Sequence, residues 1–116
     1  MKAFRILLAF ILIMIVAYTA VVIANHGMGL FPVFFGDMAK MDWPGQFNLD
    51  FMGFLMLSGL WLAWRHHFSP VGLALGALGL FGGAPVLTAY LLFAGRQADG
   101  DWAQLFLGAE RARSRT

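Results

Sequence analysis

Hydrophobic positions form long uninterrupted blocks along this chain, and the first block is the longest. Residues 6–24 contain no charged side chain, and Lys2 and Arg5 stand just in front of them. About 20 apolar residues, each rising 1.5 Å, span the roughly 30 Å hydrocarbon layer of a bilayer. We therefore expect a spanning helix over about 3–24. The alternative is a cleavable signal peptide, but its apolar core is typically about 7–15 residues long.

A second apolar block follows a connection of mixed character. Asn48 is a good N-cap residue, because its side chain can accept a hydrogen bond from a free first-turn amide. Asp50 then lies in the first turn, where the helix dipole favours an anion. These positions predict a second spanning helix over about 49–65.

The third block begins at Ser69-Pro70, which suit the N-cap and the first helical position. It predicts a spanning helix over about 70–94. Its glycines recur at spacings that let two membrane helices approach closely. This packing face consists of Gly72, Gly76, Gly79 and Gly83. Three interpretations stay open. The face packs inside this chain, it contacts a second copy or a partner subunit, or the glycines mark a helix broken at Gly82-Gly83-Ala84-Pro85.

Two shorter segments have apolar and polar residues on opposite helical faces, and we expect both to lie at the membrane interface. The first covers about 32–42 and is closed by Trp43-Pro44-Gly45. The second covers about 101–111. The expected organisation is one transmembrane helical domain over 1–96, followed by an interfacial helix and a basic, disordered tail over 97–116.

Composition agrees with lipid as the main solvent of this chain. It is 60% hydrophobic and only 12% charged, with a mean hydropathy of +0.74. A soluble domain carries roughly twice that charged fraction. The absence of cysteine excludes disulfides, thiolate nucleophiles and iron–sulfur clusters. The net charge of +2 fits basic helix ends that set membrane orientation, and we expect no binding to nucleic acid.

The distribution of basic residues favours a cytoplasmic N-terminus but contains a conflict. Lys2 and Arg5 precede the first span, and Arg65 lies in the short second loop. Lys and Arg in short flanks prefer the cytoplasmic side. Three spans would then place the C-terminus outside, so that Arg96 and the last arginines would lie on the less favoured side.

One polar cluster is expected on the predicted outer face. It would combine Asp50 and Arg96, within salt-bridge reach, with His26 and Asn48. Acids inside a membrane boundary tend to find partners. The cluster is either a small polar site or a capped helix start with a boundary ion pair. No catalytic set can be assembled, and we expect no metal or cofactor, because the histidines end helices on opposite membrane faces.

Several short motifs carry a family resemblance over roughly 1–96. They are Asn25-His26-Gly27, the aromatic connector from Leu30-Phe31 to Phe35, Asp50 opening the second span, and Trp61-Leu62-Ala63-Trp64-Arg65 closing it. With the glycine-rich third span, the chain resembles small bacterial three-span integral membrane proteins classed as a domain-of-unknown-function family. The resemblance implies architecture and no activity.

Together these patterns predict an all-α, three-span, multi-pass protein of the bacterial inner membrane. The expected role is a non-enzymatic accessory or assembly subunit of a membrane complex. Two alternatives stay open: a lipid- or isoprenoid-handling enzyme or carrier that uses the cluster around Asp50, and a small oligomeric transporter. The expected partners are membrane lipids and either other membrane subunits or further copies of the chain.

Overall fold

The computed structural model describes residues 1–114, and every regular element in that part of the chain is an α-helix. The helices are α1 (Lys2–His26), α2 (Leu30–Ala39), α3 (Trp43–Arg65), α4 (Pro70–Gly82), α5 (Ala84–Ala98), α6 (Trp102–Leu107) and α7 (Ala109–Ser114).

Two helices, α1 and α3, are long and apolar enough to cross a bilayer. The first agrees closely with the expected span over 3–24. The second begins at Trp43, six residues before the expected start at Leu49. Pro44 lies in the first turn of α3, where a missing N–H leaves no helical hydrogen bond unmade. The sequence Trp43-Pro44-Gly45 therefore starts a helix, and the expectation that it only interrupts one is wrong.

The expected third span over 70–94 is not one continuous helix. The chain breaks at Gly83, whose φ of 66° is a left-handed value that suits glycine. Pro85 follows in the first turn of α5, where it needs no hydrogen-bond partner. By length, α4 and α5 extend only about 20 and 22 Å, so neither reaches across a hydrocarbon layer alone.

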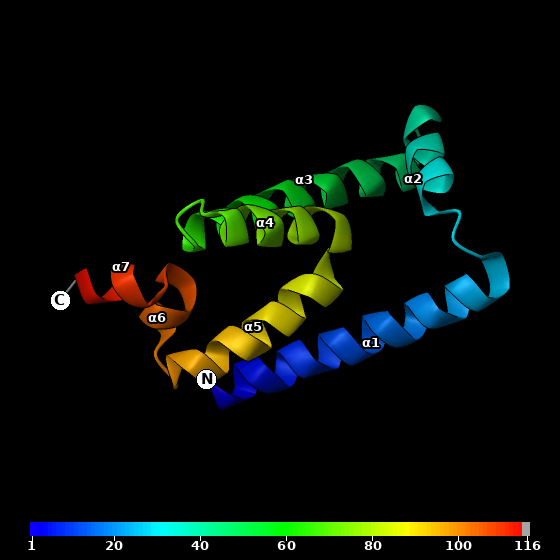
Figure 1. The fold of residues 1–116 in the computed structure, drawn as a ribbon. Helices are drawn as coiled ribbons and strands as arrows, with labels where there is room; N and C mark the ends of the chain where they lie inside the picture. The colour runs from blue at the N-terminus through cyan, green and yellow to red at the C-terminus, as the bar shows by residue number, and fades with distance from the viewer. Residues whose placement is uncertain (115–116) are drawn as a thin grey trace.

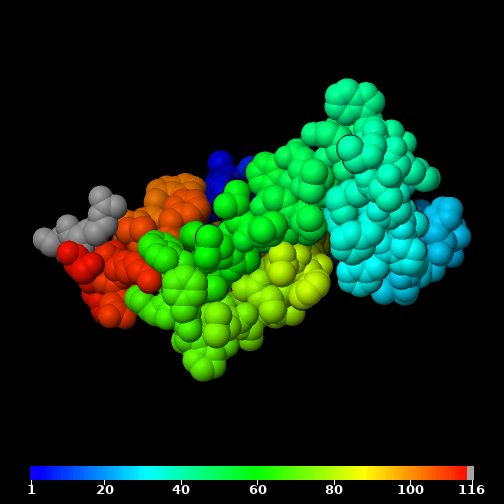
Figure 2. All heavy atoms as spheres, turned by 90° about the horizontal axis from the view of Figure 1, so that it is seen from above, coloured from blue at the N-terminus to red at the C-terminus, as the bar shows by residue number. Residues whose placement is uncertain are grey.

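The break turns α4 and α5 into a hairpin between the two long helices (Figure 1). The first arm, α4, runs back along α3, and the second arm, α5, runs back along α1. The N-terminus therefore lies at one end of the molecule, together with α6 and α7. The opposite end is formed by α2 and the turn that precedes it (Figure 2). A small apolar core beside α6 holds the first end together: Leu8, Leu91, Ala94, Ala98 and Leu105.

The helices α3 and α4 approach each other backbone to backbone at their glycines. A Cβ atom on Gly59 would stand 2.7 Å from the carbonyl oxygen of Gly76, and one on Gly76 would stand 2.9 Å from that of Gly59. On the same face, Gly72 and Gly79 lie against Ala63 and Leu62 of α3. Three glycines of the expected packing face thus contact this chain's own helix, whereas Gly83 forms the break.

The two short segments differ in detail from expectation. The first, α2, ends at Ala39 and packs on the start of α3, where Gly45 meets the backbone of Asp37 and Met38. The tail segment expected over 101–111 is divided at Gly108, with φ 87°, into α6 and α7. Helix continues to Ser114 where the sequence suggested a disordered tail; Arg115 lies outside the described residues.

Candidate functional site

The expected polar cluster is divided between the two ends of the molecule. Asp50 and Asn48 lie in the first half of α3, near α2, and His26 ends α1 at that same end. Arg96 lies in the last turn of α5, at the end that carries the N-terminus. The expected salt bridge between Asp50 and Arg96 is therefore wrong. Its physical reason is the reversal at Gly83, which returns α5 to the side where α4 began.

The three residues at the α2 end make few mutual contacts. Asp50 is exposed and has no ion-pair partner within residues 1–114. Asn48, expected as an N-cap, instead donates from Nδ2 to the carbonyl oxygen of Phe34, at 3.1 Å, and so ties α2 to α3. His26 is exposed in the last turn of α1. This end contains no assembled acid–base pair.

The densest polar network lies at the opposite end, around Arg65. Its Nε donates to the carbonyl oxygen of Leu105 at 2.7 Å, and its Nη2 donates to that of Gln104 at 3.1 Å. Its Nη1 donates to the hydroxyl of Tyr90 at 2.6 Å. One guanidinium thus joins α3, α5 and α6. Backbone carbonyl acceptors carry no side-chain signature, so a basic residue at a helix end was the only sign of this network in the sequence.

His66 extends this network, and His67 makes a separate polar contact beside it. Nε2 of His66 lies 2.5 Å from the Tyr90 hydroxyl, and Nε2 of His67 lies 3.3 Å from a carboxylate oxygen of Glu110. Burial lowers the pKa of His66, and the positive charge of Arg65 lowers it further. The ring is therefore suited to hydrogen bonding as a neutral group.

Arg111 anchors α7 to the end of α3. Its Nη1 donates to the carbonyl oxygen of Trp64 at 2.5 Å, and its guanidinium carbon lies 3.9 Å from the centre of the Trp64 ring. Cation–π contact of this kind adds to the hydrogen bond. Arg65 and Arg111 thus both connect the end of α3 to other helices.

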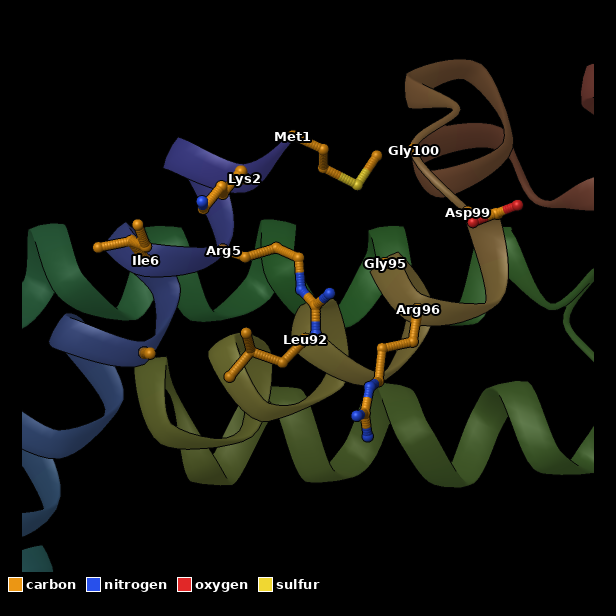
Figure 3. Close-up of a pocket in the computed structure, with 10 residues that line it drawn as sticks. Met1, Lys2, Arg5, Ile6, Leu92, Gly95, Arg96, Asp99 and Gly100 are labelled. Carbon is orange, nitrogen blue, oxygen red and sulfur yellow. The ribbon is translucent and has the colours of Figure 1, made fainter.

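A separate hollow of about 510 Å³ lies between the start of α1 and the end of α5 (Figure 3). Its charged lining consists of Lys2, Arg5 and Arg96, with Asp99 as a single carboxylate. Arg5 reaches from α1 toward α5 in this view. None of the three cations forms an ion pair within the described residues. This basic hollow can attract an anion.

Within residues 1–114, no three His, Asp or Glu side chains come together in a geometry that could hold a metal ion. Comparison of the chain with protein-family models, curated proteins and solved structures finds no match. The resemblance to a three-span family therefore stays a prediction.

Proposed function

We propose that this chain is a multi-pass protein of the bacterial inner membrane and serves as a non-enzymatic accessory subunit of a membrane complex. In this arrangement α1 and α3 cross the bilayer, and the α4–α5 hairpin enters and leaves on one side. The break at Gly83 suits this depth because the glycine is buried against Phe51 and Leu55. Irregular backbone is tolerated in a membrane where protein covers it.

The re-entrant hairpin removes the conflict in the charge distribution. Most basic residues belong to the end of the molecule that carries the N-terminus, α6 and α7: Lys2, Arg5, Arg65, Arg96 and Arg111. Short flanks rich in Lys and Arg stay on the cytoplasmic side. We therefore place both the N-terminus and α6–α7 in the cytoplasm, and α2 on the outer face.

Reporter fusions test this topology. A reporter that works only in the periplasm should be active when fused after Gln46 and silent when fused after His67 or after Arg96. Activity after Arg96 would show that the α4–α5 segment crosses the membrane, and activity after His67 would reverse the orientation.

The observation that carries the subunit proposal is the outward face of α1. The face of α1 that includes Leu8 packs on α5, but α5 has only 15 residues against the 25 of α1. In the uncovered half, Ala17, Ala20 and Ala24 are exposed and share one helical face. By helical periodicity this alanine face points away from α5. Small residues at such spacing allow another membrane helix to approach closely.

The partner we propose is a spanning helix of another subunit, docked on the alanine face. The test is purification of the native complex in mild detergent, followed by mass measurement of the particle and identification of its chains. A stoichiometric second membrane protein is expected. Ala20→Leu and Ala24→Leu should reduce its recovery, because a bulky side chain holds the two helices apart.

Val22→Leu is the matched control, since it enlarges an apolar side chain in the same turns but on the other face of α1. It should leave the recovery of the partner unchanged. A particle that contains only this chain would contradict the subunit role, with a mass of several copies indicating self-association through the face. Equal recovery with all three variants would exclude the alanine face as the docking surface.

A further inference from the structure

The geometry points to a binding site for one anionic phospholipid in the basic hollow between α1 and α5. The ligand chemistry is a phosphodiester headgroup with attached acyl chains. This inference rests on the proposed placement of α1 across the bilayer and goes beyond the subunit role. Three cationic side chains, Lys2, Arg5 and Arg96, line the hollow against the one carboxylate of Asp99.

The strongest support for this site is the unsatisfied side chain of Arg5. Its Nε is buried and makes no hydrogen bond to any described residue, although the guanidinium is a permanent cation with donors to satisfy. An unpaired buried donor of this kind is costly. In Figure 3, Arg5 lies between Lys2 and Arg96, so its guanidinium is at the centre of the cationic lining. A phosphate oxygen in the hollow would supply the missing acceptor.

The backbone adds to the positive potential on the α1 side. The first turn of α1 contains no acidic residue, and its N-cap, Met1, makes no side-chain capping bond. The free amides of a helix start therefore point toward this end, where the helix dipole favours an anion. Lys2 and Arg5 lie one turn apart on the same face, so their charges act on the same volume.

The apolar part of the lining distinguishes a lipid from a free anion. Toward the middle of α1 and α5, the lining of the hollow becomes apolar and consists of Ile6 and Ala9 of α1 and Leu92 of α5. Such a wall gives an inorganic phosphate nothing to contact, but it fits the first methylenes of an acyl chain. The hollow lies at the end of α1 that the charge distribution assigns to the cytoplasmic leaflet, whose anionic lipids attract basic residues near the membrane.

The test measures lipid retention by the full chain. Protein purified in mild detergent is mixed with equal amounts of phosphatidylglycerol and phosphatidylcholine, and native mass spectrometry counts the lipids that stay bound. One phosphatidylglycerol should be retained in preference to phosphatidylcholine. Arg5→Gln and Arg96→Gln should each reduce this preference about fivefold, the effect of losing one cation near an anionic headgroup.

Lys40→Gln is the charge-matched control. It removes one positive charge at the other end of the molecule, where Lys40 Nζ lies 3.9 Å from a carboxylate oxygen of Asp37, and it should leave lipid retention unchanged. Arg5→Lys should retain most of the preference. Because Arg96 is exposed, Arg96→Gln keeps the test informative where Arg5→Gln impairs folding.

Three results would overturn the inference: equal retention of both lipids, an equal loss of preference in Lys40→Gln, or displacement of the lipid by excess inorganic phosphate, which would assign the hollow to a free anion. Extraction of the membranes with alkaline carbonate separates the two proposals. Release of the protein would refute its membrane placement and with it the proposed function. Retention in the membrane without lipid preference would refute the lipid site alone.

Discussion

A methyl group at position 59 would test the close approach of α3 and α4. In Gly59→Ala the new Cβ would stand 2.7 Å from the carbonyl oxygen of Gly76, which is 0.7 Å less than the 3.4 Å at which ordinary contact begins. That neighbour is backbone, so only a shift of one helix can relieve the clash. Overpacking of this kind costs about 1–3 kcal/mol. The gain in helix propensity from glycine to alanine offsets about 1 kcal/mol of it.

The matched control lies in the same helix. A Cβ on Gly53 meets nothing within 4 Å, so Gly53→Ala should leave the free energy of unfolding unchanged or raise it by up to about 1 kcal/mol. The assay is denaturant or thermal unfolding in detergent for the single variants Gly53→Ala, Gly59→Ala and Gly76→Ala and for the double variant Gly59→Ala with Gly76→Ala. The double variant should lose less stability than Gly59→Ala and Gly76→Ala lose together, because one separation of the helices relieves both clashes. Equal stability of Gly59→Ala and its control Gly53→Ala would refute the described packing.

Three further perturbations concern the polar residues. Arg65→Leu leaves the carbonyl oxygens of Gln104 and Leu105 without their donor and should lower the free energy of unfolding by about 2 kcal/mol. The side chain of Leu105 is fully buried, so a Leu105→Cys label should react faster with maleimide in the Arg65→Leu background. An unchanged labelling rate would contradict the anchoring role. Because the pKa of His66 is lowered from its ordinary 6.5, its contribution to stability is complete above that pH and is lost as the pH falls through the lower folded pKa. The melting temperature should therefore fall as the pH is lowered through 6.5 and below it, and it should fall less in His66→Gln. Identical pH profiles of the two proteins would exclude this histidine as the cause. Asp50→Asn and Arg96→Gln should each change the free energy of unfolding by less than about 0.5 kcal/mol, and the two changes should add in the double variant. A coupling energy above about 1 kcal/mol would show that the two residues interact, contrary to the structure.

The elements that the sequence predicted best are those set by local chemistry. A long uncharged apolar run without glycine or proline favours one continuous helix, so α1 could be predicted within two residues of its observed ends. Ser69 caps α4 as predicted, with its side chain accepting from the amide of Gly72 at 3.1 Å. Both features depend only on neighbours within a turn of helix.

Glycine and proline were harder to interpret because each has two structural uses. Gly76 and Gly83 look alike in sequence, yet one fits a close helix contact and the other adopts a left-handed break. Likewise, Pro44 begins a helix where the pattern indicated an end. The choice depends on which helix lies opposite, and that information is tertiary.

The site was predicted poorly for the same reason. The prediction missed the reversal at Gly83. It therefore placed Arg96 at the level of Asp50, whereas the structure places it at the level of Lys2 and Arg5. The residues of the basic hollow were visible in sequence as flanking charges, but their convergence depends on α5 running antiparallel beside α1. The Arg65 network depends on backbone carbonyls, which every sequence has.

The hairpin break at Gly83 also has a consequence for how the chain is made. In a bilayer, α1 and α3 can each partition from the translocon on their own, because each is apolar over a full span. The hairpin does not have a full apolar span, and Gly83 at its tip lies against Phe51 and Leu55 of α3. The order of synthesis delivers α3 before α4, so these two side chains are in place when the tip emerges. Membrane insertion would then follow a fixed order, in which the hairpin enters last and packs against α1 and α3, which are already inserted.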